Sequence, residues 1–392
     1  MSQLEIAYLN PTSDDLKIKK IILVHTAFLG DLVLSIPLLL NLKKKYSQAE
    51  ITLICRKNVG DFFQKLNLVD KYYEIEKGNS KSYRHVINSI ASESYDYLLC
   101  PHQSIRTLFF ISKIKAKTKI GYYKWYNFLF FDHRLVRNSE LPEALRLIQL
   151  LEPLVSSESK KVFENRVKNQ NFNQKKEYHL KEVPLWASLN LAEIVQKDEF
   201  SYRKLQKKLA LINETEDVVV EKKQKLICVF PGSVWATKRW REENYIQLIS
   251  LLLKNQFRIF LMGAPGEEKL CQEIFRQVNA VSKSSDLYDF SARTTVYESV
   301  LLMKEADLII GNDSASSHLA CVLDKKLITF FGPTVLGFGY RPWGNNVYVF
   351  ENETLSCRPC GKHGHQVCPL GTHECMRSIL SFEVMKFILK IV

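Results

Sequence analysis

A turn at residues 311–313 carries the groups best suited to bind an anion. The apolar run 308–310 predicts a buried strand, and the chain then breaks at Gly-Asn-Asp before Ser314 opens a small-residue helix. The free N–H groups of a first helical turn and the positive end of the helix dipole favour a phosphate or diphosphate. His318 lies one turn beyond Ser314 on the same helix face. A helix capped by Asn or Asp explains the pattern equally well, so both interpretations stay open here.

Two further turns place charged side chains just beyond predicted strands. Lys238 and Arg239 follow the turn at 231–233, where cations suit a departing phosphate, although Lys-Arg pairs are common on protein surfaces. Glu267 follows another strand end, where a carboxylate can accept hydrogen bonds from ribose hydroxyls or simply open a helix. The basic turn and the 311–318 segment therefore give one predicted domain two anion-directed features.

Asp31 ends the first strand-to-helix turn, at residues 26–31. This turn has one glycine where the dinucleotide fingerprint needs three, so a nicotinamide cofactor is not expected. Asp31 suits either of two roles: a helix-start carboxylate matched to the dipole, or a general base within reach of an attacking hydroxyl. Taken alone, its position favours the helix-start role.

Strands and helices alternate along the chain, a pattern that predicts parallel sheets covered by helices. We expect two doubly wound, Rossmann-like α/β domains facing across a cleft, with ligands beyond the carboxyl ends of the strands. The expected domains are residues 1–198 and 225–376, joined by a linker at 199–224 and followed by a helix at 377–392, a candidate to pack back on the N-terminal domain. The predicted strands include 19–25, 51–55, 95–100, 225–230, 257–262, 308–310 and 327–331, and the predicted helices include 30–46 and 241–254.

The chain is basic, with 55 Lys and Arg against 42 Asp and Glu and a formal net charge of +13. Such an excess suggests an anionic partner: nucleic acid, phosphorylated lipid or a membrane surface. A lysine-rich composition that only aids solubility gives the same charge. No apolar run reaches the roughly 20 residues of a spanning helix, and the first residues do not resemble a signal peptide. We therefore expect a protein that stays in the cytoplasm.

Basic and aromatic residues interleave between positions 109 and 137. This interleaving suits single-stranded nucleic acid, and it equally suits a phosphorylated lipid, where rings lie at the level of the headgroups. Burial of the rings in the core is a third explanation. The aromatic members are Phe109, Phe110, Tyr122, Tyr123, Trp125, Tyr126, Phe128, Phe130 and Phe131, and the basic members are Lys113, Lys115, Lys117, Lys119, Lys124, Arg134 and Arg137.

Nine cysteines fall into two groups. The five that stand singly in apparent strands or helices predict small, buried, reduced core residues: Cys55, Cys100, Cys228, Cys271 and Cys321. The other four, Cys357, Cys360, Cys368 and Cys375, have the opening C-x2-C spacing of a zinc site but no second C-x-x-C pair. Reduced structural cysteines are the default interpretation of this group, and structural zinc is the alternative.

Three motifs in this order resemble those of the ADP-heptose–lipopolysaccharide heptosyltransferases, a family of GT-B glycosyltransferases. They are Leu29-Gly-Asp-Leu-Val-Leu-Ser-Ile-Pro37, then Pro231-Gly-Ser233 with Thr237-Lys-Arg-Trp240, and then Gly311-Asn-Asp-Ser314 with His318-Leu-Ala320 and Phe331-Gly-Pro-Thr334. The resemblance runs from about residue 19 to the C-terminus. The tail, with Cys357-Arg-Pro-Cys360, Cys368-Pro-Leu-Gly371 and Cys375-Met-Arg377, is most similar to the heptosyltransferase II branch.

The resemblance implies a role for each matching position. Asp31 would take the proton from the acceptor hydroxyl, Asp313 would bond heptose hydroxyls, and Glu267 would hold the ribose. Lys238, His318 and the backbone of Ser314 and Ala315 would hold the diphosphate, with alanine at 315 where the family usually has glycine. Ser233 and Thr237 complete the expected donor site, and Gly30 and Arg106 the expected acceptor site.

The function expected from the resemblance is inverting, metal-independent transfer of heptose from ADP-heptose to the lipopolysaccharide inner core. No cofactor is expected. The expected partners are the nucleotide-sugar donor, a phosphorylated lipid-linked saccharide acceptor and, peripherally, the inner face of the cytoplasmic membrane of a Gram-negative bacterium, rather than nucleic acid. The alternatives are a different nucleotide sugar or acceptor on the same fold and, further off, a non-enzymatic nucleic-acid-binding module with a Cys-rich tail.

Overall fold

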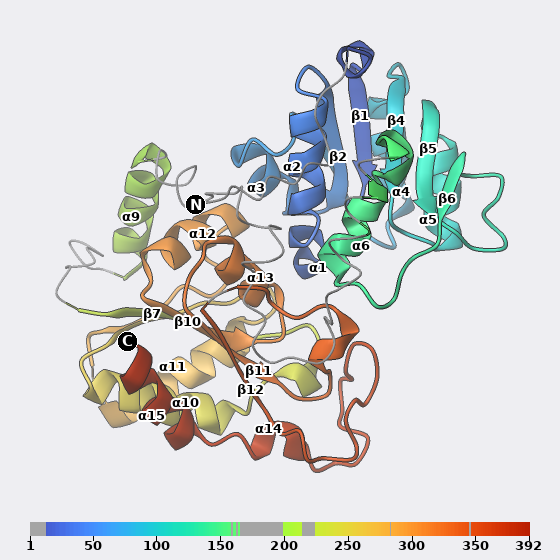
Figure 1. Cartoon of the computed structure of the whole chain (residues 1–392). Coiled ribbons are helices and arrows are strands. Elements are labelled where there is room, and N and C mark those ends of the chain that lie inside the picture. The colour runs from blue at the N-terminus through green and yellow to red at the C-terminus, as the bar shows by residue number, and fades with distance from the viewer. Residues whose placement is uncertain are drawn as a thin grey trace. The chain divides into compact units, whose positions relative to one another are not determined.

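The chain forms two compact units, Met1–Ser188 and Leu189–Val392. The structure is a computed structural model and describes residues 13–157, 160, 161, 164, 199–213, 224–282, 284–344 and 346–392 (Figure 1). Each unit contains one six-stranded sheet whose paired strands are all parallel. The expected α/β architecture with two Rossmann-like sheets is confirmed. No helix among the described residues is long and apolar enough to cross a membrane.

The N-terminal sheet has the strand order β3-β2-β1-β4-β5-β6. The order reverses between β1 and β4, and ligands of doubly wound sheets bind at such a reversal, beyond the strand carboxyl ends. The strands are β1 (Lys20–Val24), β2 (Glu50–Arg56), β3 (Lys71–Ile75), β4 (Tyr95–Cys100), β5 (Ala116–Tyr122) and β6 (His133–Leu135). The helices are α1 (Leu29–Val33), α2 (Ile36–Lys45), α3 (Gly60–Lys65), α4 (Ser80–Ser89), α5 (Ile105–Ser112) and α6 (Glu143–Gln149).

The second sheet repeats this topology, with the order β12-β11-β10-β7-β8-β9 and a reversal between β7 and β10. Its strands are β7 (Leu226–Phe230), β8 (Arg258–Leu261), β9 (Leu287–Asp289), β10 (Leu308–Asn312), β11 (Leu327–Phe331) and β12 (Val347–Glu351). Its helices are α9 (Glu199–Asn213), α10 (Glu242–Lys254), α11 (Glu268–Ser282), α12 (Val296–Glu305), α13 (Ala315–Val322), α14 (Glu374–Arg377) and α15 (Ser381–Ile391). In Figure 1, α10, α11 and α15 lie on one side of this sheet and α12 and α13 on the other.

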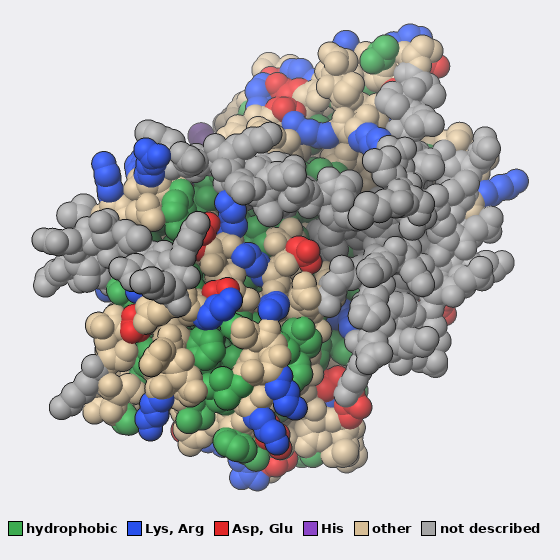
Figure 2. Space-filling model, turned by 60° about the vertical axis from the view of Figure 1, so that its left-hand side comes forward, with side chains coloured by type: hydrophobic (Ala, Val, Ile, Leu, Met, Phe, Trp, Pro, Cys, Tyr) green, Lys and Arg blue, Asp and Glu red, His purple; other side chains and the backbone are tan. Residues whose placement is uncertain are grey.

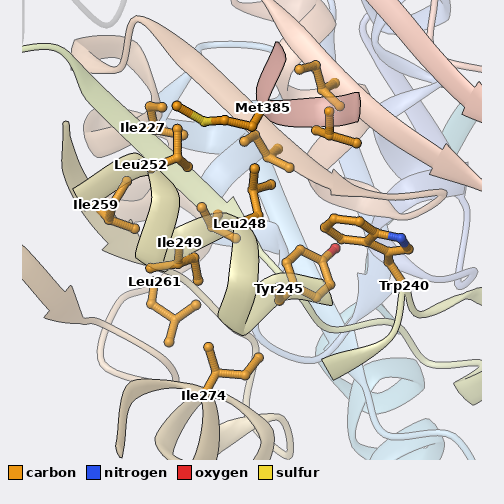
Figure 3. Packing of buried hydrophobic residues seen from close by; sticks show 14 of the residues in the cluster. Ile227, Trp240, Tyr245, Leu248, Ile249, Leu252, Ile259, Leu261, Ile274 and Met385 are labelled. Carbon is orange, nitrogen blue, oxygen red and sulfur yellow. The ribbon is translucent and has the colours of Figure 1, made fainter. Parts of the chain in front are cut away.

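Helix α15 packs against α10 within the second unit. Its buried residues Val384, Met385 and Ile388 join the same hydrophobic cluster as Leu248 and Leu252 of α10 (Figure 3). Helix α15 therefore belongs to the second unit, and packing of residues 377–392 on the N-terminal domain stays a prediction. The apolar face of the helix, at the spacing of i, i+1 and i+4, is already buried beside α10.

The structure gives more detail on two other predicted segments. The expected linker at 199–224 begins as a helix, because α9 buries Leu205 and Leu209 and pairs Lys208 with Glu298 of α12 at 2.8 Å. The single helix expected at 30–46 is two helices, α1 and α2, and Pro37 stands at the start of the second. Proline has no N–H to donate to the preceding turn, so a continuous helix is broken there.

The five single cysteines are buried free thiols, as predicted. Burial raises the pKa of the Cys100 and Cys228 thiols to about 12, which keeps them protonated and unreactive near neutral pH. In Figure 2 the described Lys and Arg side chains lie among Asp, Glu and apolar groups.

Candidate active site

The reversal point of the second sheet is held together by the side chain of Asn312, the last residue of β10. Its Nδ2 donates to the carbonyl oxygens of Pro231 at 2.9 Å and Gly232 at 3.1 Å, just beyond β7. Its Oδ1 accepts the N–H of Trp240 at 2.8 Å and the hydroxyl of Tyr245 at 3.1 Å. Asn312 is fully buried, and sequence reasoning assigned it no role of its own. The only signal was an asparagine directly after an apolar strand.

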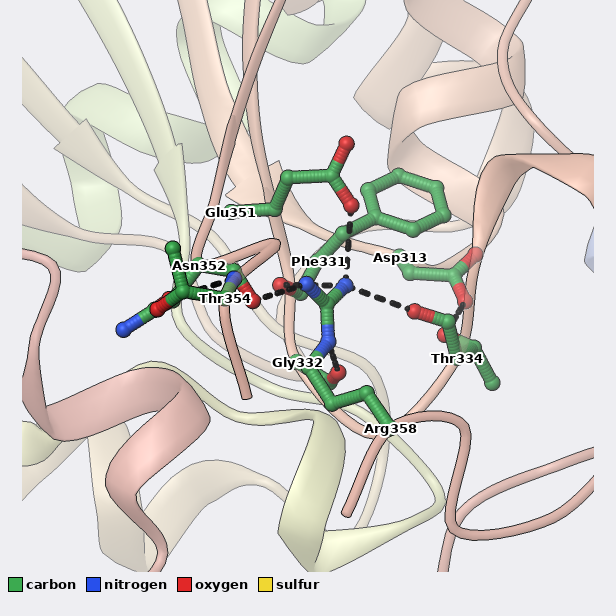
Figure 4. Close-up of polar contacts among 8 residues, drawn as sticks. All are labelled: Asp313, Phe331, Gly332, Thr334, Glu351, Asn352, Thr354 and Arg358. Atoms are coloured by element: carbon green, nitrogen blue, oxygen red, sulfur yellow. Dashed lines mark hydrogen bonds and ion pairs between the residues drawn. The ribbon is translucent and has the colours of Figure 1, made fainter. Parts of the chain in front are cut away.

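Asp313, the residue after Asn312, forms a buried ion pair with Lys238. Lys238 Nζ lies 2.5 Å from Asp313 Oδ2, and the two side chains are 14% and 8% exposed. The hydroxyl of Thr334 donates to the same Oδ2 at 2.7 Å (Figure 4). Both contacts that the described residues make to this carboxylate fall on Oδ2, so Oδ1 keeps its capacity to accept a hydrogen bond. The structure thus brings two predicted donor residues together, and Thr334 joins them.

Helix α13 begins at Ala315, directly after this pair. Ser314 precedes it with extended backbone and makes no side-chain capping bond to the helix, so the first-turn N–H groups are not covered by the N-cap side chain. Ala315 is helical rather than left-handed, so the backbone conformation does not require the glycine usual at this position. Such first-turn donors suit an anion, and anion binding here stays a prediction.

His318 is buried one turn into α13, and burial lowers its pKa to about 4. Asp313 acts in the opposite direction, and the positive charge of Lys238 lowers the pKa further. The imidazole is therefore neutral near pH 7, so that His318 offers a ligand one N–H donor rather than a positive charge.

Glu267 lies against the turn that follows β7. A Cβ on Gly232 would lie 2.0 Å from the Glu267 carboxyl carbon, so the absence of a side chain there makes room for this carboxylate. Glu267 Oε2 accepts the N–H of Ala264 at 2.8 Å, and burial raises the pKa of the carboxyl group. Ser233 is buried in the same turn, and its carbonyl oxygen accepts from Arg239 Nε at 2.9 Å.

Thr237 connects the basic turn to the Cys-rich segment of the chain, residues 357–375. Its hydroxyl donates to the His365 carbonyl at 2.8 Å and accepts the His365 N–H at 2.7 Å. A ring nitrogen of His373 lies 2.8 Å from the Thr237 carbonyl oxygen. Direct contact of Thr237 with a donor stays a prediction, whereas its contact with the Cys-rich segment was missed.

The four cysteines of the segment are free thiols. Among the residues that the structure describes, no three His, Cys, Asp or Glu side chains are grouped so that they could hold a metal ion. Structural zinc, the alternative for this segment, therefore stays a prediction.

The N-terminal unit gathers charged side chains around Lys77, just beyond β3. Burial lowers the pKa of Lys77, and the nearby cations Arg56 and Arg106 lower it further, while Asp31 raises it. Asp31 lies in the first turn of α1, and the carbonyl oxygen of the adjacent Gly30 accepts an N–H inside the helix at 3.3 Å. The predicted Asp31 and Arg106 therefore share one electrostatic environment, to which the structure adds two cations.

Two histidines lie at the reversal point of the same sheet. The ring centroids of His25 and His102 are 5.1 Å apart, and His102 Nε2 accepts the N–H of Thr26 at 2.8 Å. His25 Nδ1 is buried with no hydrogen-bond partner among the described residues. Sequence reasoning missed both, although His25 ends the strand predicted at 19–25 and His102 lies two residues beyond the strand predicted at 95–100.

Comparisons with known proteins show the family and the fold that this chain resembles. The family model described as glycosyltransferase family 9 (heptosyltransferase) matches residues 83–370. Lipooligosaccharide heptosyltransferase 2 of Haemophilus influenzae is 20% identical over 318 residues, which are 80% of this chain and 83% of the relative. The structure of Escherichia coli ADP-heptose lps heptosyltransferase II has a TM-score of 0.69 at 17% identity, with 95% and 98% of the two chains covered. Escherichia coli heptosyltransferase WaaC with ADP-2-deoxy-2-fluoro heptose has a TM-score of 0.63 at 14% identity, with 95% and 100% covered.

Proposed function

Since the chain belongs to glycosyltransferase family 9, the heptosyltransferases, we propose that it transfers heptose from ADP-heptose to the lipopolysaccharide inner core, as a heptosyltransferase II would. Family membership makes the chain a glycosyltransferase, so the alternative of a non-enzymatic nucleic-acid-binding module is wrong. The donor, the inverting course and the branch of the family are parts of the proposal.

One observation carries the donor assignment: the buried Lys238–Asp313 pair lies directly before the start of α13 at a sheet reversal point. The first-turn N–H groups of α13 suit a diphosphate, while Asp313 Oδ1 suits a sugar hydroxyl. Glu267 beside Gly232 suits the ribose of a nucleotide. A relative of the same fold was solved with an ADP-heptose analogue, which supports this class of donor.

The proposed reaction is a displacement at the anomeric carbon. The acceptor oxygen forms a bond to that carbon while the bond to the ADP diphosphate breaks, and Asp31 takes the proton of the attacking hydroxyl. Negative charge grows on the departing diphosphate, where Lys238 and the helix start supply positive potential without a bound metal. His318, neutral at pH 7, contributes a hydrogen bond there. Attack from the face opposite the leaving group inverts the anomeric centre.

We further propose that the N-terminal unit binds a phosphorylated, lipid-linked saccharide acceptor at the surface of an anionic membrane. Part of the basic-aromatic stretch is core, since Phe110, Tyr122 and Phe131 are buried. Another part is exposed, including Trp125 at 79% and Leu129 at 81%. The exposed apolar members are Phe109, Tyr123, Trp125, Phe128, Leu129 and Val136, and exposed Lys113, Lys115, Lys117, Lys124 and Arg134 lie between them in the sequence. Exposed rings and leucines flanked by cations suit the headgroup layer.

A donor and acceptor screen tests the function. The purified protein would be given ADP-heptose, other ADP-sugars and UDP-sugars, each with defined lipid A–core acceptors, and the product linkage and anomer would be determined by mass spectrometry and NMR. We expect transfer from ADP-heptose with inversion. Transfer only from another nucleotide sugar would establish the alternative of the same fold with a different donor. Sedimentation with phosphatidylglycerol vesicles tests the membrane surface, and we expect a Trp125→Ala/Leu129→Ala variant to bind them less than the wild-type protein does.

A further inference from the structure

The Cys-rich segment fastens the loop that follows β11 through one buried arginine, Arg358. Its Nε donates to the carbonyl oxygen of Gly332, and its Nη2 donates to that of Thr334 at 3.0 Å (Figure 4). The N–H of Cys360 adds a bond to the carbonyl oxygen of Pro333 at 2.9 Å. Three consecutive carbonyl groups, from Gly332 to Thr334, are therefore held by this one segment.

Arg358 is itself fixed in place. Its Nη2 lies 2.8 Å from Glu351 Oε2 of β12, and the two side chains are only 3% and 5% exposed. Its Nη1 donates to the carbonyl oxygen of Asn352. A guanidinium group offers five N–H donors in one rigid plane, so it can satisfy this set of acceptors at once, which a lysine ammonium cannot match in geometry.

The loop held by Arg358 carries the hydroxyl that orients Asp313. Thr334 Oγ1 donates to Asp313 Oδ2 at 2.7 Å, and Lys238 contacts the same oxygen. We propose that Arg358 is a positioning residue for donor binding, which sets the Asp313 carboxylate through Thr334. This inference rests on the proposed role of Asp313 with the donor sugar. It gives the Cys-rich segment a task in the reaction: the segment anchors one side of Asp313 through Arg358 and, through His365 and Thr237, the turn that bears Lys238.

The position of Arg358 predicts that substitutions of Arg358 and Thr334 have coupled effects on kcat/KM for the donor and leave the acceptor KM unchanged. Arg358→Lys keeps the charge but loses the planar donor set, and Thr334→Val removes the hydroxyl while keeping the side-chain shape. We expect each to lower kcat/KM for the donor by about 10- to 100-fold, the effect of an ångström-scale misplacement of a site group, with the acceptor KM unchanged. Because both act through one contact, the double variant should lose no more than the worse single variant.

Arg258→Lys is the matched control, since Arg258 is a largely buried arginine of the same unit, 3.5 Å from Asp286. It should lower the melting temperature and leave donor kinetics unchanged. Equal donor kinetics for Arg358→Lys and the wild-type protein, or losses that multiply in the double variant, would overturn the proposal. If Arg358→Lys does not fold, Thr334→Val decides, and wild-type kinetics in that variant would overturn it. A wild-type protein that transfers no heptose to any acceptor would instead overturn the proposed function.

Discussion

The side-chain oxygen of Asn312 accepts the backbone N–H of Trp240 at 2.8 Å, across 72 residues of sequence and inside a fully buried environment. The same side chain bonds three more groups, so Asn312→Ala leaves buried donors and acceptors without partners. Each such group costs about 1–3 kcal/mol. We therefore expect the free energy of unfolding, measured with urea, to fall by about 3 kcal/mol or more.

Asn312→Asp tests the contribution of the hydrogen bonds of this side chain, because the substitution leaves the side-chain volume nearly unchanged. A carboxylate keeps the acceptor for Trp240 but replaces the amide donor that faces the carbonyl oxygens of Pro231 and Gly232. We expect this variant to be destabilised despite its nearly identical shape. A stability equal to that of the wild-type protein would mean that the two Nδ2 bonds contribute little.

The strands of this fold could be predicted from sequence because fully buried parallel strands are continuous apolar runs. The bounds of β11, Leu327–Phe331, match the predicted strand. The hydrogen bonds of the Asn312 side chain could not be predicted in this way, since its partners lie 67 to 81 residues away in the sequence. For the same reason α9 was taken for a linker: its partner Glu298 is 90 residues from Lys208.

The site residues likewise divide into those that a local sequence pattern identifies and those whose contacts depend on distant parts of the chain. Motif order located Lys238 and Asp313, because strand-end turns are local features of the sequence. Their contact at 2.5 Å and the part of Thr334 in it depend on three separate turns meeting, which no local pattern states. The Cys-rich segment was considered as a metal site because its spacing is visible, whereas the contacts of its arginine and histidines with the donor half are not.

Replacement of Asp31 tests whether its carboxylate acts as a general base or only stabilises the start of a helix. Asp31→Asn keeps the shape and a hydrogen-bonding side chain but cannot take a proton, so transfer should fall by about 10²- to 10⁴-fold. Calorimetric ADP binding should be unchanged. Asp61→Asn is the control, because Asp61 is likewise an acidic residue in the first turn of a helix, α3. Similar kinetics for the two variants would leave Asp31 with a helix-start role only.

Gly232 should be intolerant of a side chain because of Glu267. The Cβ of Gly232→Ala would lie 2.0 Å from the Glu267 carboxyl carbon, so the buried carboxylate must move. We expect weaker ADP binding, by about tenfold or more, since one displaced charge-assisted hydrogen bond is worth about 1.5–3 kcal/mol. Gly337→Ala is the control, since a Cβ there meets nothing within 4 Å. If ADP titrations gave the same Kd for both variants, Glu267 would have no role in binding the nucleotide.

The lowered pKa of His318 predicts how the free energy of unfolding depends on pH. Its pKa in the folded protein is about 4, below the ordinary value of 6.5, so between these values the unfolded chain binds a proton that the folded chain does not. The free energy of unfolding therefore falls as the pH drops from 6.5 towards 4, by about 2 kcal/mol at pH 5 from this residue alone. Burial also lowers the pKa of His25 well below its usual range, which acts in the same direction.

Urea unfolding at pH 7.5 and pH 5 of the wild-type protein and His318→Gln measures this contribution. The variant lacks the titrating group, so its loss of stability between the two pH values should be smaller than that of the wild-type protein by about 2 kcal/mol. His85→Gln, on the exposed side of α4, should keep the wild-type pH dependence. Parallel pH profiles for His318→Gln and the wild-type protein would show that His318 is protonated to the same extent in the folded and unfolded chains. The imidazole would then take up its proton as the pH falls through about 6.5, its ordinary pKa, rather than near 4.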